Sequence, residues 1–169
     1  PLHNTKLNNS IFETNSYLLK KSCPSLIEYA TFFGSIRIFD YLKKIENELT
    51  PTLWGAAIHS NNQEMFFLFQ EENVISNNTE LLKMAICCHH NDFVNYISEL
   101  GDLGFDEPFE THYFTEIIGS YNFTYLNQNC VGNEIDGKDL FYLFCKNDYY
   151  PFVDFFVRNK NDDINWETV

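Results

Sequence analysis

The sequence predicts an all-α fold, a solenoid in which short helix-turn-helix units stack side by side. Two observations predict it. A segment with one pattern of apolar residues recurs about every 27–28 residues, a spacing within the range of solenoid repeats. A small residue and a turn-forming residue also recur at fixed places in each segment. A single helix of this kind cannot bury its apolar side alone, whereas stacked neighbours can.

The chain divides into a lead-in and a repeat domain. We expect residues 1–24 to form an N-terminal lead-in or a capping helix, and residues 25–169 to form the repeats. The expected units span about residues 25–49, 50–78, 79–107, 108–137 and 138–169. The fourth is degenerate, and the fifth runs into a further repeat.

The first three units align without gaps over their helices. Their first helices start near Leu26, Leu53 and Leu81. Four residues later each has an alanine, where two helices would approach closely: Ala30, Ala57 and Ala85. After four more residues comes a turn residue: Gly34, Asn61 and His89. Gly and Asn tolerate the left-handed conformation that ends many helices.

The second helix of each unit carries apolar residues at positions i, i+1 and i+4, which predicts one buried helical face. These residues are Ile38, Phe39, Leu42, Met65, Phe66, Phe69, Phe93, Val94 and Ile97. The fifth unit follows the same spacing with Phe152, Val153 and Phe156, although Phe144 takes the small-residue position and Asp148 the turn position. The fourth unit, around Phe114–Leu126, shows the pattern only weakly.

The recurring positions of these units resemble those of the ankyrin repeat. Its spacing is followed by Leu26–Leu42 and by Leu140–Phe156. The residues at 161–165, Asn-Asp-Asp-Ile-Asn, are similar to the hairpin that precedes a further ankyrin repeat. Several sequence segments are more closely similar to an ankyrin-type domain of unknown function that is expanded in some unicellular parasites. They are Ser25–Leu42, Glu48–Trp54, Ala57–Asn62, Cys88–Asp92 and Phe141–Cys145.

The chain also departs from the ankyrin pattern. The Thr-Pro-Leu-His tetrapeptide is absent, and the early repeats are shorter than the roughly 33 residues of a standard unit. The missing residues belong to the β-hairpin, so we expect shortened or missing hairpins. The resemblance implies a scaffold that binds a protein partner without catalytic residues, metal or cofactor.

In ankyrin repeats, the two residues before each turn face the concave groove. The resemblance therefore implies that a partner binds to Phe32, Phe33, His59, Ser60, Cys87 and Cys88. Large aromatic side chains beside small polar ones suit a protein-binding surface.

The composition disfavours other classes of partner. A formal net charge of −13 opposes binding to nucleic acid and to anionic membrane surfaces. No apolar run reaches the roughly 20 residues that span a bilayer, and the start lacks a signal-peptide pattern. Five cysteines, an odd number without a secreted spacing, favour a reducing cytoplasm. We expect a cytoplasmic monomer.

Two other chemistries compete with the scaffold hypothesis. The main enzymatic alternative is a thiol-dependent hydrolase that uses Cys88 with His59, which occupy similar positions in adjacent repeats. A zinc site at residues 87–90, Cys-Cys-His-His, is disfavoured because successive helical residues point about 100° apart.

Overall fold

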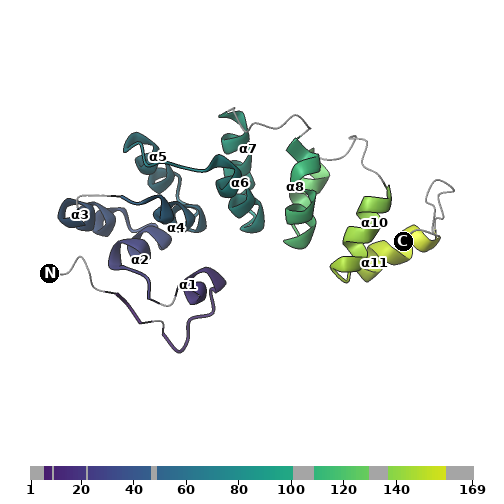
Figure 1. Ribbon diagram of the computed structural model, residues 1–169, viewed down its shortest axis with the longest axis horizontal. Coiled ribbons are helices and arrows are strands. Elements are labelled where there is room, and N and C mark those ends of the chain that lie inside the picture. The colour runs from purple at the N-terminus through teal and green to yellow at the C-terminus, as the bar shows by residue number, and fades with distance from the viewer. Residues whose placement is uncertain are drawn as a thin grey trace. The chain divides into compact units, whose positions relative to one another are not determined.

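The structure is a computed structural model of the 169-residue chain. It describes residues 6–8, 10–21, 23–46, 49–100, 109–129 and 137–158. Within these residues the regular elements are helices, and β pairing is limited to one isolated bridge between Lys6 and Ser25 (Figure 1). The all-α part of the predicted fold class is therefore confirmed. The chain divides into two compact units, Pro1–Met84 and Ala85–Val169.

The first unit contains five α-helices and a short 3₁₀ helix among its described residues, together with the start of α6. These are α1 (Ser16–Lys20), α2 (Leu26–Phe32), α3 (Ile36–Glu46), η2 (Pro51–Leu53), α4 (Trp54–His59), α5 (Gln63–Glu71) and α6 (Asn78–Cys87). Helix α2 packs against α3, α4 packs against α5, and the two first helices, α2 and α4, pack against each other.

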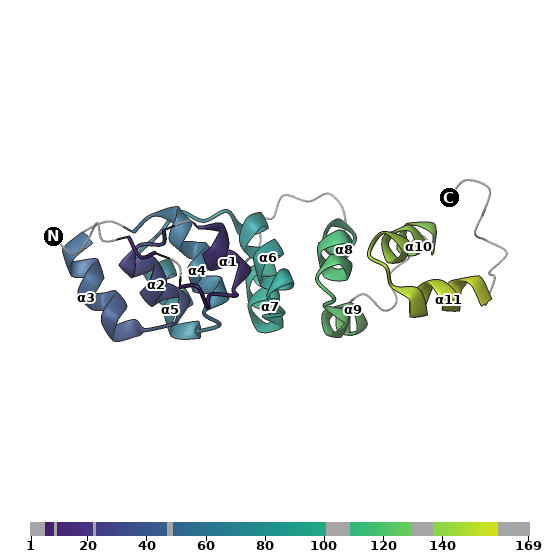
Figure 2. The same cartoon turned by 90° about the horizontal axis from the view of Figure 1, so that it is seen from below.

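The second unit continues the alternation. Its helices are α7 (Asn91–Glu99), α8 (Phe109–Gly119), α9 (Phe123–Asn129), α10 (Gly137–Lys146) and α11 (Tyr150–Arg158). Figure 2 shows α8 with α9 and α10 with α11 as two pairs, and the first helices α8 and α10 also contact each other.

Each first helix ends in a turn with a left-handed residue. Positive φ angles occur at five turn residues: Gly34, Asn61, His89, Tyr121 and Asp148. After α2, the N–H of Ser35 donates to the carbonyl of Ala30 and that of Gly34 to Thr31, as in a Schellman motif. The same pair of hydrogen bonds closes α6, α8 and α10. The weakly patterned fourth unit thus has the same turn as the others.

The apolar face of the second helices forms much of the core. The expected residues of α5 and α7 are buried, as are Phe39 and Leu42 in α3. Ile38, by contrast, is 56% exposed, which contradicts its predicted burial.

In α11, Phe152 stacks on Phe144 but remains partly exposed, and Val153 and Phe156 are only half-buried. These three residues are therefore less buried than predicted.

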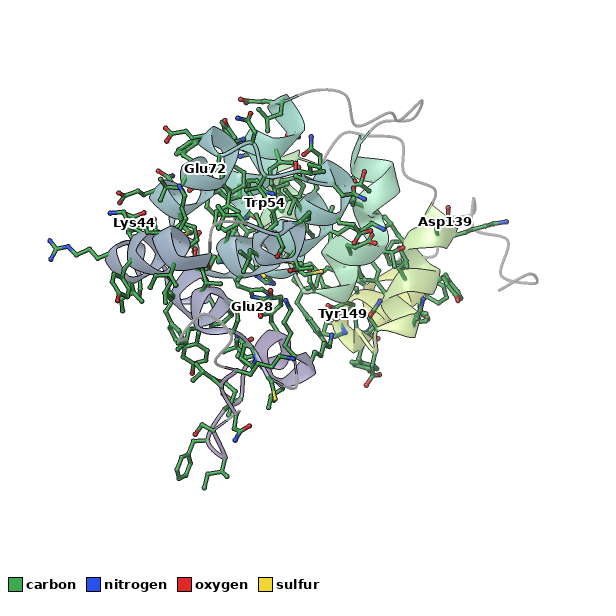
Figure 3. The ribbon with its side chains drawn as sticks, turned by 60° about the vertical axis from the view of Figure 1, so that its left-hand side comes forward. Glu28, Lys44, Trp54, Glu72, Asp139 and Tyr149 are labelled. Carbon is green, nitrogen blue, oxygen red and sulfur yellow. The ribbon has the colours of Figure 1, made fainter. Side chains whose placement is uncertain are left out.

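The connectors between helix pairs contain no strand where the structure describes them, at residues 49–50 and 72–77. The indole N–H of Trp54 donates to the carbonyl of Val74 at 3.1 Å and so holds the second connector against α4. Trp54 itself is buried against Phe66 and Phe69 (Figure 3).

The hairpin-like residues 161–165 and Cys130 lie outside the described residues. Across the helices that the structure describes, none has the length and apolar character to span a membrane.

Candidate interaction site

The first candidate residues lie at the ends of two neighbouring helices. Helix α2 begins at a capping box, in which Ser25 accepts from the N–H of Glu28 while the Glu28 carboxylate accepts from that of Ser25. It ends at Phe32, and Phe33 is its C-cap. His59 is the last residue of α4. Because α2 packs on α4, the ends of both helices meet on one side of the unit.

Phe32, Phe33 and His59 form a continuous set of rings, which we call the aromatic strip. The ring centroids of Phe32 and Phe33 are 5.1 Å apart, and those of Phe32 and His59 are 5.6 Å apart. Tyr29 extends the set, 4.9 Å from Phe33. Phe33 is 57% exposed, whereas Phe32 and His59 are half-buried. The structure therefore brings these three predicted residues together.

The N-terminal helix covers part of this strip, which sequence reasoning did not foresee. The Tyr17 ring of α1 lies nearly parallel to that of Phe32, with the ring centroids 5.8 Å apart and the planes at 9°, and its centroid is only 4.5 Å from that of His59. It also packs on Gly55 of α4, where an added Cβ would meet two Tyr17 atoms at 2.9 Å. Gly55 inside a helix was the available signal, since glycine there often permits a close approach.

A buried charge fixes α1 at its other end. The Lys21 ammonium forms an ion pair with Glu28 and lies 5.1 Å from the centre of the Tyr17 ring. Glu28, which Figure 3 labels on α2, is only 8% exposed. Burial alone lowers the pKa of Lys21, but the bond to Glu28 and the proximity of Tyr17 outweigh it, so the pKa is raised. Burial raises the pKa of the Tyr17 phenol, against the opposing effect of Lys21.

An open pocket of about 370 Å³ adjoins Tyr17. Trp54, Leu81 and Met84 supply apolar lining, and Lys21 and Glu80 supply charged groups. The surface around α1 therefore offers apolar volume next to the covered strip.

The other predicted residues have different environments. Ser60 caps α4, where its hydroxyl donates to the carbonyl of Ala57 at 2.7 Å and accepts from the N–H of Asn62. That hydroxyl is engaged in the turn and is less suited to a partner than the sequence suggested. Cys87 and Cys88 belong to the second unit, at the end of α6, with Cys87 exposed and Cys88 half-buried.

The environment of the two cysteines bears on the thiol hydrolase. Burial raises the pKa of Cys88 to about 11, with a further contribution from Cys87. Burial, followed by the Glu116 carboxylate, also raises the pKa of Cys87. A catalytic cysteine needs its thiolate, which a lowered pKa supplies. The environment of Cys87 and Cys88 raises the pKa of both thiols and so does not supply the lowered pKa that activates a cysteine nucleophile.

The adjacent histidine is also part of a turn. His89 has a left-handed conformation, and its Nε2 lies 2.6 Å from the carbonyl oxygen of Ser120. Over the residues that the structure describes, no group of three or more His, Cys, Asp or Glu side chains is arranged to hold a metal ion.

Comparison with known proteins does not identify a relative. No protein-family model matches the chain, and neither the curated proteins nor the solved structures include a significant match.

Proposed function

We propose that the chain is a non-catalytic protein-binding scaffold, built as an ankyrin-like solenoid with reduced hairpins, that binds its partner through the concave helical groove. Two features support the repeat architecture. Every first helix ends at a left-handed turn residue, and first helices pack side by side within each unit, α2 on α4 and α8 on α10.

A third supporting feature is a recurring hydrogen bond between successive helix pairs. The residue after the turn donates to a carbonyl at or near the preceding pair's turn: Asn62 to Gly34 at 3.3 Å, Asn122 to Ile86 at 3.1 Å, and Tyr149 to Ile118 at 2.7 Å. Such repeated contact between neighbours is the basis of a solenoid.

The aromatic strip carries the proposal of binding. Phe33 leaves more than half of its surface in water while its neighbours Phe32 and Tyr29 hold its ring in place. A preordered, exposed aromatic side chain is the kind of group that dominates binding energy at protein interfaces. The formal charge of −13 favours a partner with basic as well as apolar surface.

Partner capture with the full chain tests this proposal. The parent chain is compared with Phe33→Ala, His59→Ala and the control Tyr41→Ala, since Tyr41 on α3 is 59% exposed and lies outside the strip. We expect Phe33→Ala and His59→Ala to reduce recovery of the same protein at least fivefold and Tyr41→Ala to leave it unchanged. Equal recovery by all four folded chains would refute the proposal.

A further inference from the structure

We propose that the partner inserts an aromatic side chain into the position of Tyr17 and, four residues later in its own sequence, a Lys or Arg into the position of Lys21. Helix α1 would then be an internal substitute that occupies the binding site until the partner displaces it. The inference rests on the proposed function, because it specifies which partner chemistry the aromatic strip accepts.

The Tyr17 ring packs against both Phe32 of α2 and His59 of α4, which also contact each other, and Gly55 provides the space for its ring. All three contacting residues belong to helices that pack on each other without α1. The position therefore persists when the Tyr17 ring leaves, and a flat aromatic side chain fits it.

Glu28 is nearly buried, and its carboxylate pairs with the Lys21 ammonium. A buried carboxylate without a cation is costly, so a segment that displaces Lys21 must replace its charge. Residues i and i+4 lie on one face of a helix. The two positions together select a helical turn with an aromatic residue followed at i+4 by a basic residue.

Helix α1 has five residues, far fewer than an isolated helix needs for stability. Of these five only Leu18 is fully buried, so a displacing segment must also supply one apolar side chain there, and Ile11 and Phe12 just before the helix are exposed. Short elements with few buried contacts open locally at low cost. Being tethered, α1 competes at a high effective concentration and weakens binding of a free segment to the parent chain.

The probe is a fluorescent peptide with the sequence of residues 13–22, measured by anisotropy against the full chain. Two chains vacate the site: Tyr17→Ala, which removes the ring, and Lys21→Glu, which repels α1 from Glu28. We expect the peptide to bind either variant at least tenfold more tightly than the parent chain. Peptides carrying Tyr17→Ala or Lys21→Glu should bind the opened chains at least tenfold more weakly than the unaltered peptide.

Circular dichroism checks the helical content of each variant. If the Tyr17→Ala chain fails to fold, the Lys21→Glu chain is used for the comparison with the parent chain. Equal affinity for parent and opened chains, or equal affinity of the altered peptides, would overturn the inference. If those results occur while Phe33→Ala still loses the captured partner, the proposed function stands and only this partner chemistry fails. If the peptide binds as expected but neither Phe33→Ala nor His59→Ala reduces capture, the position binds only the chain's own helix α1, and both proposals fail.

Discussion

At the scale of single residues, the five turns show how different side chains occupy one backbone conformation. Gly34 adopts it without strain, while Asn61, His89 and Asp148 are polar residues. Tyr121 is the exception, because a bulky side chain with φ of 63° carries a cost of about 1–2 kcal/mol. Its ring packs edge-on against Tyr149 at 4.7 Å, a contact that offsets part of this cost.

Gly34→Ala should destabilise the chain by about 1–2 kcal/mol, because a Cβ is strained at φ of 61° and meets Nδ2 of Asn62 at 2.9 Å. Chemical denaturation measures the change. Gly119→Ala is the matched control, since its Cβ would meet only Oδ1 of Asn147 at 3.8 Å, an ordinary van der Waals distance, and the helix gains from alanine. Equal effects of the two substitutions would argue against the left-handed turn.

Asn122 should be one of the most sensitive polar positions. It is 1% exposed, its amide donates to Ile86 and to Asn91, and its oxygen accepts from the N–H of Tyr125. Asn122→Ala leaves these groups unsatisfied and removes a helix cap, so we expect a loss of about 2–4 kcal/mol in unfolding free energy. The exposed Asn95→Ala is the control, and a similar small loss in both would contradict the hydrogen-bond network.

Cys88 should react slowly with iodoacetamide at pH 7. A pKa of about 11 against an ordinary value of 9.0 leaves about a hundredfold less thiolate. The rate should then rise through pH 9–11, as the thiol ionises. Mass spectrometry of single cysteines compares it with the exposed Cys145. Faster labelling of Cys88 than of Cys145 at pH 7 would support the thiol hydrolase instead.

At the scale of elements, the helix pairs with a small, polar or glycine turn residue were predictable from the sequence. The fourth pair was expected only as a degenerate unit, because its turn residue is Tyr121 and rules for left-handed turns favour Gly and Asn. The position of α1 was equally hidden, since one helical turn has no periodicity to detect. The residues of the aromatic strip were predictable only in part: Phe32, Phe33 and His59 followed from the repeat, but Tyr17 did not.

Gly55→Ala should loosen α1. The new methyl group gains up to about 1 kcal/mol of helix propensity in α4, but it overlaps the Tyr17 ring, and such overpacking costs about 1–3 kcal/mol. The smallest adjustment is for α1 to move away. We therefore expect faster tryptic cleavage after Lys20 and Lys21, with the rest of the chain intact. An unchanged cleavage rate, matching that of Gly119→Ala, would show that α1 tolerates the methyl group.

At the scale of the whole molecule, the aromatic strip and the helix that covers it lie within the first compact unit. The strip can therefore be tested by changes in one part of the chain while the second unit provides controls. The formal charge of −13 gives long-range attraction to a basic partner, and salt weakens that attraction.

Hydrogen–deuterium exchange on the chain, alone and with its captured partner, tests the central claim most directly. We expect slower exchange at residues 28–33 and 55–60, where the partner binds, together with faster exchange at residues 16–21, where α1 is displaced. Protection confined to residues 137–158, with exchange at residues 16–21 unchanged, would contradict it.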